Sequence, residues 1–399
     1  MFSPLLAASL PRQMPRKLES SYLNVRDCAV PRGPKIPRDV PSVERRQIGL
    51  KDIASHLGLS KATVSYILSG SAGAKSIPER TKERVLNAAR ELNYRPNFVA
   101  RSLQSQRTYS IGVLVPEFSD GYSALVLNGI EERLRENGYL CLVTSHGRNP
   151  DALVQYPQML FDRRVEGLIA VDTPYAQDLP IPIVSVSGHD RIPGVTYVVL
   201  NHDMAADLAL QHLISLGHKR IAFIRGQSFT ADAMARWNSI KTAARKWKIE
   251  IDPSLVAQLD ENSPSPLVGY RATARIIANA SEPFTALFAF NDVSAIGAIK
   301  ALHEAGLQVP RDVSLIGFDD IMAAAFQSPA LTTIRQPLAQ MGMLAADVLL
   351  KRISTKDTQP QIVQVAPELV VRESTASARL QGNPRKSSKS NKASARARS

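Results

Sequence analysis

Four side chains on the outer face of one predicted helix have the chemistry needed to contact the bases and phosphates of DNA. Lys61, Ala62, Ser65 and Tyr66 point away from the apolar side of a helix expected over residues 61–68. A lysine ammonium can donate to the O6 and N7 acceptors of guanine, and an alanine methyl can contact the methyl of thymine. A serine hydroxyl can hold a backbone phosphate. The alternative for Lys61 is a solvated charge on an exposed helix.

The residues before this helix predict a second helix and a tight turn. Their apolar residues recur at the i, i+3, i+4 and i+7 spacing of one helix face. Gly58 then ends the first helix, and Ser60 provides an N-cap for the second. Two such helices form a helix-turn-helix, whose second helix lies in the major groove of DNA. The inward positions are Leu50, Ile53, Ala54 and Leu57, then Val64, Ile67 and Leu68.

A longer set of alternating patterns follows. From Ser110 onward, short runs rich in Val, Ile and Leu alternate with helix-length segments. This alternation is typical of βαβ units in parallel sheets with both faces covered. Such sheets usually bind ligands at the carboxyl ends of their strands. The expected strands are Ile111–Val115, Leu140–Thr144, Gly167–Val171, Ile183–Val186, Ile221–Ile224, Ala286–Ala289 and Val313–Ile316.

Composition excludes several protein classes. The 399-residue chain is 44% hydrophobic, which is enough for two or three domains with cores of their own. Its two cysteines, Cys28 and Cys141, are too few for a disulfide scaffold or a four-cysteine zinc site. We therefore expect a reducing cytoplasm and no cofactor or metal. No apolar run is long enough to span a membrane, and the N-terminus lacks the basic region of a signal peptide.

The positive charge is concentrated at the two ends of the chain. The net charge is +13, of which residues 1–110 carry +11 and residues 376–399 carry +7, so the remainder is −5. A mildly acidic body with basic ends suggests that the ends meet a polyanion. For the last 24 residues, a charged tail that only keeps the protein soluble explains the composition equally well.

Six stretches of the chain form a pattern more specific than a helix-turn-helix alone. They are Leu50–Ala54, Gly58–Ser65, a third helix over Glu79–Leu92, Asn93–Asn97, Val99–Leu103 and Arg372–Thr375. Together they resemble the LacI/GalR family of bacterial transcriptional regulators over most of the chain. The resemblance implies that Lys61 and Ala62 contact bases of the major groove, with Tyr66 beside them, and that Ser60, Thr63 and Ser65 contact phosphates. Tyr66 stands where the family often has arginine, and the stretch Ser69–Ser76 is longer than usual.

The resemblance also implies a hinge helix over residues 97–104. Such a short helix is marginal alone because nucleation is unfavourable. In the family it folds on the operator, where a leucine from each of two copies enters the minor groove. Here that leucine is Leu103, whose insertion between base steps would bend the duplex. The alternative is that Leu103 is a buried linker residue.

For residues 110–375, the resemblance implies the two-lobed fold shared with periplasmic sugar-binding proteins. Arg236, Asn291 and Asp319 match the family's polar effector contacts, and a guanidinium, an amide and a carboxylate suit sugar hydroxyls. Alternatives are a surface position for Arg236 and a strand-end cap for Asp319. Asp292 is expected to cap its helix. Aromatic candidates for covering a sugar ring are Phe118, Tyr122, Trp237 and Phe290.

Departures from the family pattern bear on the effector. Ser187 and Asn201 stand where relatives often carry aspartate, and Ser239 replaces a usual glycine, so we expect a less acidic cleft than a typical hexose site. Positions of the purine-responsive branch match poorly, which favours a sugar over a nucleobase.

We therefore expect a small all-α helix-turn-helix headpiece joined to an α/β two-lobed, periplasmic-binding-protein-like effector domain. The expected division is a disordered extension over 1–46, a DNA-binding headpiece over 47–96, a hinge and linker over 97–109, an effector-binding and dimerisation domain over 110–375, and a disordered basic tail over 376–399.

The expected function is a cytoplasmic homodimeric repressor that binds double-stranded operator DNA and responds to a small-molecule effector, with no membrane partner. The dimer would use the helix from Tyr122 to Asn137. One alternative is a ligand-responsive activator, and another is a solute-binding protein without specific DNA reading. An enzyme is the third: Cys141 lies near His146, but the sequence has no nucleophile elbow, phosphate loop or metal-ligand spacing.

Overall fold

The computed structural model divides into two units, one ending at Arg101 and one beginning at Ser102. It describes residues 48–94, 102, 107–119, 121–174, 179–188, 192–230, 232–260, 265–355 and 359–378. The expected extension over 1–46 and most of the expected hinge, including Leu103, lie outside these ranges, as does the tail beyond residue 378. No helix in the described ranges combines the length and apolarity that crossing a membrane requires.

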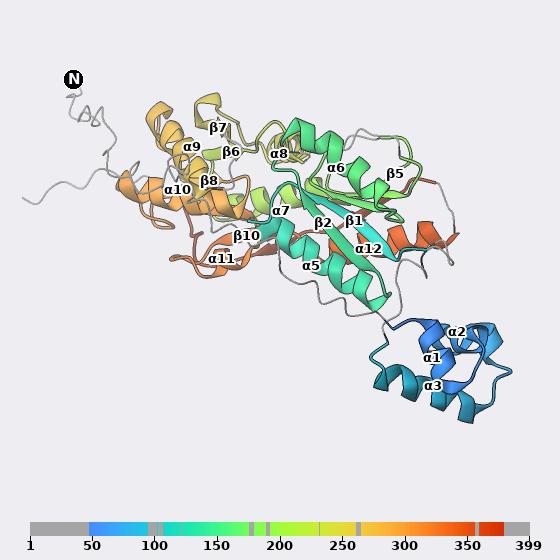
Figure 1. Ribbon diagram of the computed structural model, residues 1–399. Coiled ribbons are helices and arrows are strands. Elements are labelled where there is room, and N and C mark those ends of the chain that lie inside the picture. The colour runs from blue at the N-terminus through green and yellow to red at the C-terminus, as the bar shows by residue number, and fades with distance from the viewer. Residues whose placement is uncertain are drawn as a thin grey trace, which may run out of the picture. The chain divides into compact units, whose positions relative to one another are not determined.

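The first unit is a three-helix headpiece (Figure 1). Its helices are α1 (Leu50–Leu57), α2 (Lys61–Ser69) and α3 (Glu79–Glu91), with a 3₁₀ turn, η1 (Ala72–Ala74), between the last two. Gly58 ends α1 in the left-handed region at φ 65°, and the Ser60 hydroxyl accepts from the Thr63 N–H at the start of α2, as the sequence predicts. Apolar spacing therefore sets the helices, and their shared core is Ile53, Ala54, Val64, Ile67, Val85 and Ala88.

The second unit contains two six-stranded sheets with the same internal order. The first sheet runs β11-β5-β4-β3-β1-β2 and the second runs β12-β10-β9-β8-β6-β7. Neighbouring strands are parallel except β12, which is antiparallel to β10. The first sheet holds β1 (Ser110–Val115), β2 (Leu140–Ser145), β3 (Leu168–Val171), β4 (Ile183–Val186), β5 (Val195–Leu200) and β11 (Ile362–Val365). The second holds β6 (Ile221–Arg225), β7 (Val256–Gln258), β8 (Ala286–Phe288), β9 (Ser314–Asp319), β10 (Thr332–Arg335) and β12 (Glu368–Val370).

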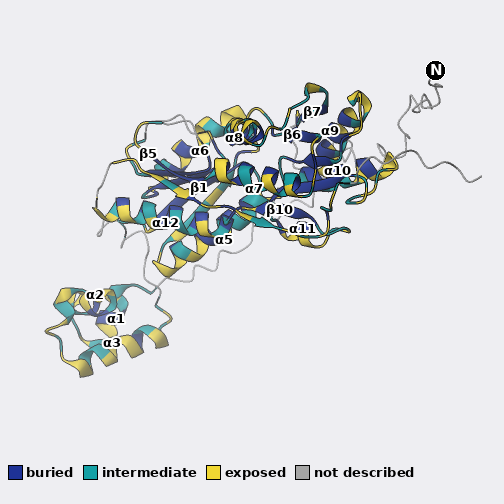
Figure 2. Ribbon diagram, turned by 180° about the vertical axis from the view of Figure 1, so that it is seen from behind, coloured by how far each residue is buried: buried dark blue, intermediate teal, exposed yellow. Residues whose placement is uncertain are grey.

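Helices cover both faces of each sheet, so the strands are mostly buried (Figure 2). In the first lobe these are α5 (Gly121–Glu136), α6 (Pro150–Asp162) and α12 (Leu338–Thr355). In the second they are α7 (His202–Ser215), α8 (Ala233–Lys246), α9 (Pro266–Asn279) and α10 (Asp292–Glu304), with the short α11 (Met322–Ala325) and the 3₁₀ turn η2 (Pro253–Leu255). The expected two-lobed α/β architecture is confirmed, and the chain crosses between the sheets after β5, β10 and β11.

The seven predicted strands are all present, but five others were missed: β5, β7, β10, β11 and β12. The folded body also continues past its expected end at residue 375. The backbone N–H of Ala376 donates to the Ser314 hydroxyl, and that of Ala378 donates to the Leu216 carbonyl.

Helices α5 and α12 pack with their backbones almost in contact. A Cβ added at Gly129 of α5 would lie 1.9 Å from the Ala339 carbonyl oxygen, and one added at Gly342 of α12 would lie 2.2 Å from that of Val126. Because both neighbours are backbone atoms, a larger side chain cannot be accommodated by changing a rotamer. Close packing of the first lobe therefore depends on these two glycines.

Replacing Gly129 with alanine should destabilise the protein despite alanine's better helix propensity. Overpacking a tight interior typically costs about 1–3 kcal/mol, and the two helices must separate to admit the methyl group. Chemical denaturation of the full chain measures the free energy of unfolding. Asn128→Ala is the matched control, because Asn128 is exposed on the same helix. Equal stability of Gly129→Ala and Asn128→Ala would show that the helices are not in close contact.

Candidate functional site

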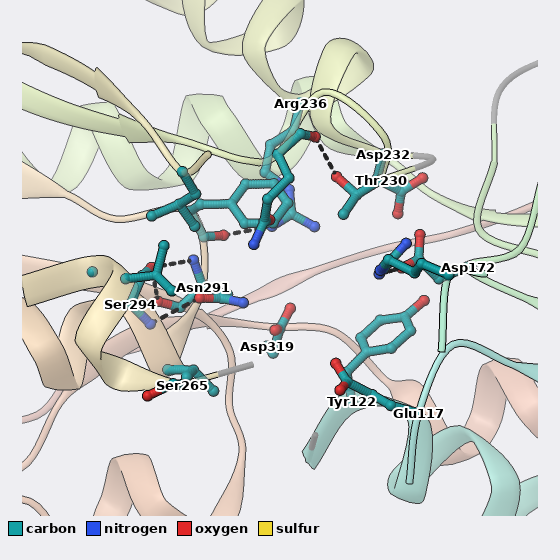
Figure 3. A pocket seen from close by; sticks show the side chains of 17 residues that line it. Glu117, Tyr122, Asp172, Thr230, Asp232, Arg236, Ser265, Asn291, Ser294 and Asp319 are labelled. Carbon is teal, nitrogen blue, oxygen red and sulfur yellow. Dashed lines mark hydrogen bonds and ion pairs between the residues drawn. The ribbon is translucent and has the colours of Figure 1, made fainter. Parts of the chain in front are cut away.

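A polar pocket lies between the two lobes of the second unit, at the carboxyl ends of their strands (Figure 3). In each sheet the strand order reverses beside a central strand, β1 in the first and β6 in the second. Open α/β sheets bind ligands at such switch points. The lining residues are Glu117, Tyr122, Arg148 and Asp172 from the first lobe, and Gln227, Thr230, Asp232, Arg236, Leu259, Ser265, Val268, Gly269, Phe290, Asn291, Val293, Ser294 and Asp319 from the second.

Arg236 is buried between two aromatic rings and does not occupy a surface position. It lies in the first turn of α8, and its guanidinium carbon is 3.6 Å from the Phe318 ring centroid and 4.4 Å from that of Phe290. One Nη donates to the Phe290 carbonyl at 2.6 Å. Its Nε is buried and has no hydrogen-bond partner among the described residues. A buried guanidinium N–H without a partner is costly, so a ligand oxygen would be a favourable partner for this group.

Asn291 and Asp319 reach the pocket from the ends of neighbouring strands. Asn291 caps α10, and its side-chain oxygen accepts from the Ser294 N–H at 2.9 Å, which leaves its amide nitrogen for other partners. Asp319 ends β9 at φ 106°, and its Oδ1 accepts from Gln336 Nε2 at 2.6 Å. A non-glycine residue with this backbone is strained, a feature that concentrates at functional sites.

The first lobe contributes groups that the sequence analysis mostly missed. Tyr122, which was predicted, hydrogen-bonds to the buried Ser187, and burial raises the pKa of its phenol well above the usual value. Arg148 forms a 2.7 Å ion pair with Asp172 and stacks 4.9 Å from the ring centroid of Phe229 in the second lobe. Asp172 directly follows β3, so the rule that ligands bind at strand ends could have found it.

Two predicted aromatic residues do not line the pocket. Trp237 packs edge-on against Phe223 in the core, with Arg225 above its ring. Successive helix residues point about 100° apart, so Arg236 and its neighbour Trp237 cannot both face the cleft. Phe118 is 57% exposed and is absent from the lining residues.

The cleft contains several acidic groups, and its acidity relative to a typical hexose site stays a prediction. Four carboxylates line the pocket, from Glu117, Asp172, Asp232 and Asp319, against two guanidinium groups. Asp232 Oδ1 accepts a hydrogen bond from the Gly188 N–H of the first lobe at 3.1 Å, and His202 Nε2 lies 3.5 Å from Asp232 Oδ2. Neither Ser187 nor Asn201 is among the lining residues, so their departures from the family pattern do not set the acidity.

Asp292 does not cap α10 as predicted, because Asn291 holds that position. The Asp292 carboxyl is fully buried behind the pocket, where it accepts from the Thr333 hydroxyl at 2.6 Å and the Ile321 N–H at 2.9 Å. Burial raises its pKa to about 7. The folded state therefore holds this proton more tightly than the unfolded chain does.

Replacing Asp292 with asparagine should reduce the dependence of stability on pH. The group's stabilising contribution in the wild type is complete below about pH 4 and is lost as pH rises toward 7, by at most roughly 1.4 kcal/mol per pH unit. Asparagine can keep both hydrogen bonds, with its amide donating to Thr333. The advantage of the variant should grow from pH 4 to 7 and then stay constant, as measured by chemical denaturation. Exposed Asp151→Asn is the control, and a difference independent of pH would contradict the prediction.

The cysteine considered as a nucleophile has the wrong environment for one. Burial raises the pKa of the Cys141 thiol to about 12, so the reactive thiolate is scarce at neutral pH. The His146 side chain bonds instead to the Thr173 hydroxyl and the Arg148 N–H, and burial lowers its pKa to about 4. Within the described ranges, no cluster of His, Cys, Asp or Glu has metal-ligand geometry.

The headpiece presents the predicted DNA-contacting residues on α2. Lys61 and Ala62 are exposed, Ser65 is half-buried and Tyr66 is 47% exposed. The Ser60 and Thr63 hydroxyls lie 2.8 Å apart, so the two predicted phosphate contacts adjoin at the helix start. Leu103, the predicted minor-groove residue, lies outside the described residues.

Comparison with known proteins gives two family matches. Residues 49–97 match bacterial regulatory proteins of the lacI family, and residues 210–375 match a periplasmic binding protein-like domain. The repressor PurR of Haemophilus influenzae is 36% identical over 341 residues, which cover 82% of this chain and 98% of PurR.

Two solved structures are similar over almost the same span. The lac repressor dimer bound to operator and an anti-inducer has a TM-score of 0.74 and 26% identity, covering 83% of this chain and all of that one. The transcriptional regulator CelR in complex with cellobiose has a TM-score of 0.62 and 27% identity, covering 82% of this chain and 99% of that one.

Proposed function

The chain belongs to the lacI family of bacterial regulatory proteins, and we propose that it is a cytoplasmic homodimeric repressor whose operator affinity is set by a sugar or sugar derivative. The DNA-binding unit would be the headpiece, through Lys61, Ala62 and Tyr66 on bases and Ser60, Thr63 and Ser65 on phosphates. The hinge leucine, Leu103, would enter the minor groove. The observation that carries the effector part of the proposal is the pocket whose polar groups come from both lobes.

The composition of the pocket favours a polyhydroxylated ligand. Carboxylates accept from hydroxyls, while Arg236 and the Asn291 amide donate to them, so both halves of each hydroxyl's hydrogen-bonding capacity can be met. Tyr122 and Phe290 offer ring surface to an apolar sugar face. The related CelR structure contains cellobiose, which supports the same ligand class here.

The last residues of the linker are held by the first lobe, which supports a route from ligand to hinge. One oxygen of Glu166 accepts from the backbone N–H groups of Thr108 and Tyr109, both at 2.7 Å, and the other accepts from Arg107 at 2.8 Å. A ligand that changes the angle between lobes would therefore move the chain leading to the hinge. The coupling must be reciprocal, so operator DNA changes ligand affinity by the same factor.

The experiment is a selection of genomic fragments by the purified full chain at physiological salt, with and without a panel of sugars, nucleobases and nucleosides. We expect one pseudo-palindromic sequence and a severalfold or larger change in its affinity with one sugar. A response only to a nucleobase would contradict the sugar assignment, but the proposal of an effector-controlled DNA-binding regulator would stand. If binding shows no sequence preference and weakens steeply with salt, the basic ends of the chain alone would explain the DNA interaction. A promoter fusion then distinguishes repression from activation.

A further inference from the structure

Two features of the headpiece pack against each other: Tyr66 on α2 and the stretch Ser69–Ser76 that follows it. In the structure this stretch folds back over α2 through η1. The backbone N–H groups of Gly70 and Ser71 both donate to the Tyr66 carbonyl, which fixes the start of the turn to the residue that it covers.

Gly73 lies on one face of the Tyr66 ring. A Cβ added at Gly73 would be 2.9 Å from Cδ2, 3.0 Å from Cγ and 3.2 Å from Cδ1 of Tyr66. A point at nearly equal distances from these three atoms lies close to the axis that passes through the ring centre perpendicular to the ring plane, and therefore over one face of the ring. The phenol ring therefore rests on glycine backbone, and a methyl group at position 73 fits only if the ring shifts.

Outside the face that packs on Gly73, the Tyr66 side chain is exposed to solvent. Tyr66 is 47% exposed although one ring face is covered, and Ala62, four residues earlier on the same helix face, is too small to screen it. An exposed tyrosine would otherwise sample several rotamers, which must be restricted when it contacts DNA. A ring held against the turn reaches the complex already oriented.

We propose that the Ser69–Ser76 turn is a specificity element that positions the Tyr66 phenol for contact with one base pair in each half-site, an inference that rests on the proposed DNA-binding function. Gly73 is the positioning residue and Tyr66 is the contacting one. The phenol both donates and accepts, so its base preference depends on where the ring is held, whereas a flexible arginine can find guanine acceptors by itself.

The test uses the full chain and four variants: Gly73→Ala, Tyr66→Ala, the double variant, and Ala72→Ser as a control at an exposed position of the same turn. Each protein selects its sequence from a randomised half-site library, and thermal unfolding checks the headpiece. Gly73→Ala should change the preference at one base position by about fivefold, on the scale of one restricted side chain. Tyr66→Ala should affect the same position, and Gly73→Ala should add nothing in its background.

Three results would overturn the proposal. The first is a wild type that selects no sequence, which also removes the proposed function. The second is a wild type with a defined operator whose base preferences Gly73→Ala leaves unchanged at every position, which removes this inference alone. The third is an equal change in preference when Gly73→Ala is made without the Tyr66 ring, because the turn would then act independently of Tyr66.

Discussion

Replacing Lys61 with alanine is expected to lower the preference for operator over non-specific DNA by at least about 30-fold. A lysine contact to guanine acceptors contributes roughly 1–3 kcal/mol of discrimination, and a dimer on a two-fold operator makes the contact twice. Lys61 is exposed in the first turn of α2 and forms no ion pair with the described residues of the headpiece, so its removal should not disturb the fold. Competition binding of operator against random duplex measures the ratio directly.

The control for this variant is Lys82→Ala, which removes the same charge from α3 of the headpiece. Lys82 forms an exposed pair with Glu79 at 2.9 Å, and such pairs contribute little to stability. Both variants should weaken non-specific binding slightly and to a similar extent. If Lys82→Ala lowered the preference as much as Lys61→Ala, the effect of Lys61 would be its charge alone, and α2 would not be the reading helix.

The headpiece could be predicted closely because its signals are local. Apolar spacing and two caps determine α1 and α2, and the observed bounds differ from the prediction by one residue at most. The missed strand β10 shows where such reasoning stops. It reads Thr-Thr-Ile-Arg, yet Thr332 and Thr333 are fully buried, and their bonds to Ser374 and Asp292 from distant parts of the chain offset the cost of burying polar groups. Only the tertiary fold makes that polar strand a buried one.

The candidate site was predictable where a family pattern or a strand end identified the residue. Arg236, Asn291 and Asp319 do meet in one pocket, while Arg148 and Asp232 were missed. Each of these two lies in a loop whose direction depends on how the lobes pack, which local sequence does not encode.

Replacing Asp319 with asparagine should weaken effector binding by about 100-fold, on the scale of one lost charged hydrogen bond. The substitution keeps the shape, and its amide oxygen can still accept from Gln336, which holds Asp319 at 2.6 Å. The second carboxylate oxygen is replaced by an amide NH2 group, which donates, so a ligand hydroxyl loses a charged acceptor. Isothermal titration with the effector measures the affinity, and the exposed Asp347→Asn is the control.

The decisive comparison is between the two variants. If the sites are separate and coupled through the hinge, Asp319→Asn should bind operator like the wild type in the absence of effector. It should need about 100-fold more effector to change its operator affinity, because that change depends on how much effector the pocket binds. Lys61→Ala should keep the wild-type effector affinity in the absence of DNA. Loss of operator binding in effector-free Asp319→Asn would mean that the strained strand end at φ 106° maintains the DNA-binding state itself, and the carboxylate would then not be a simple ligand contact.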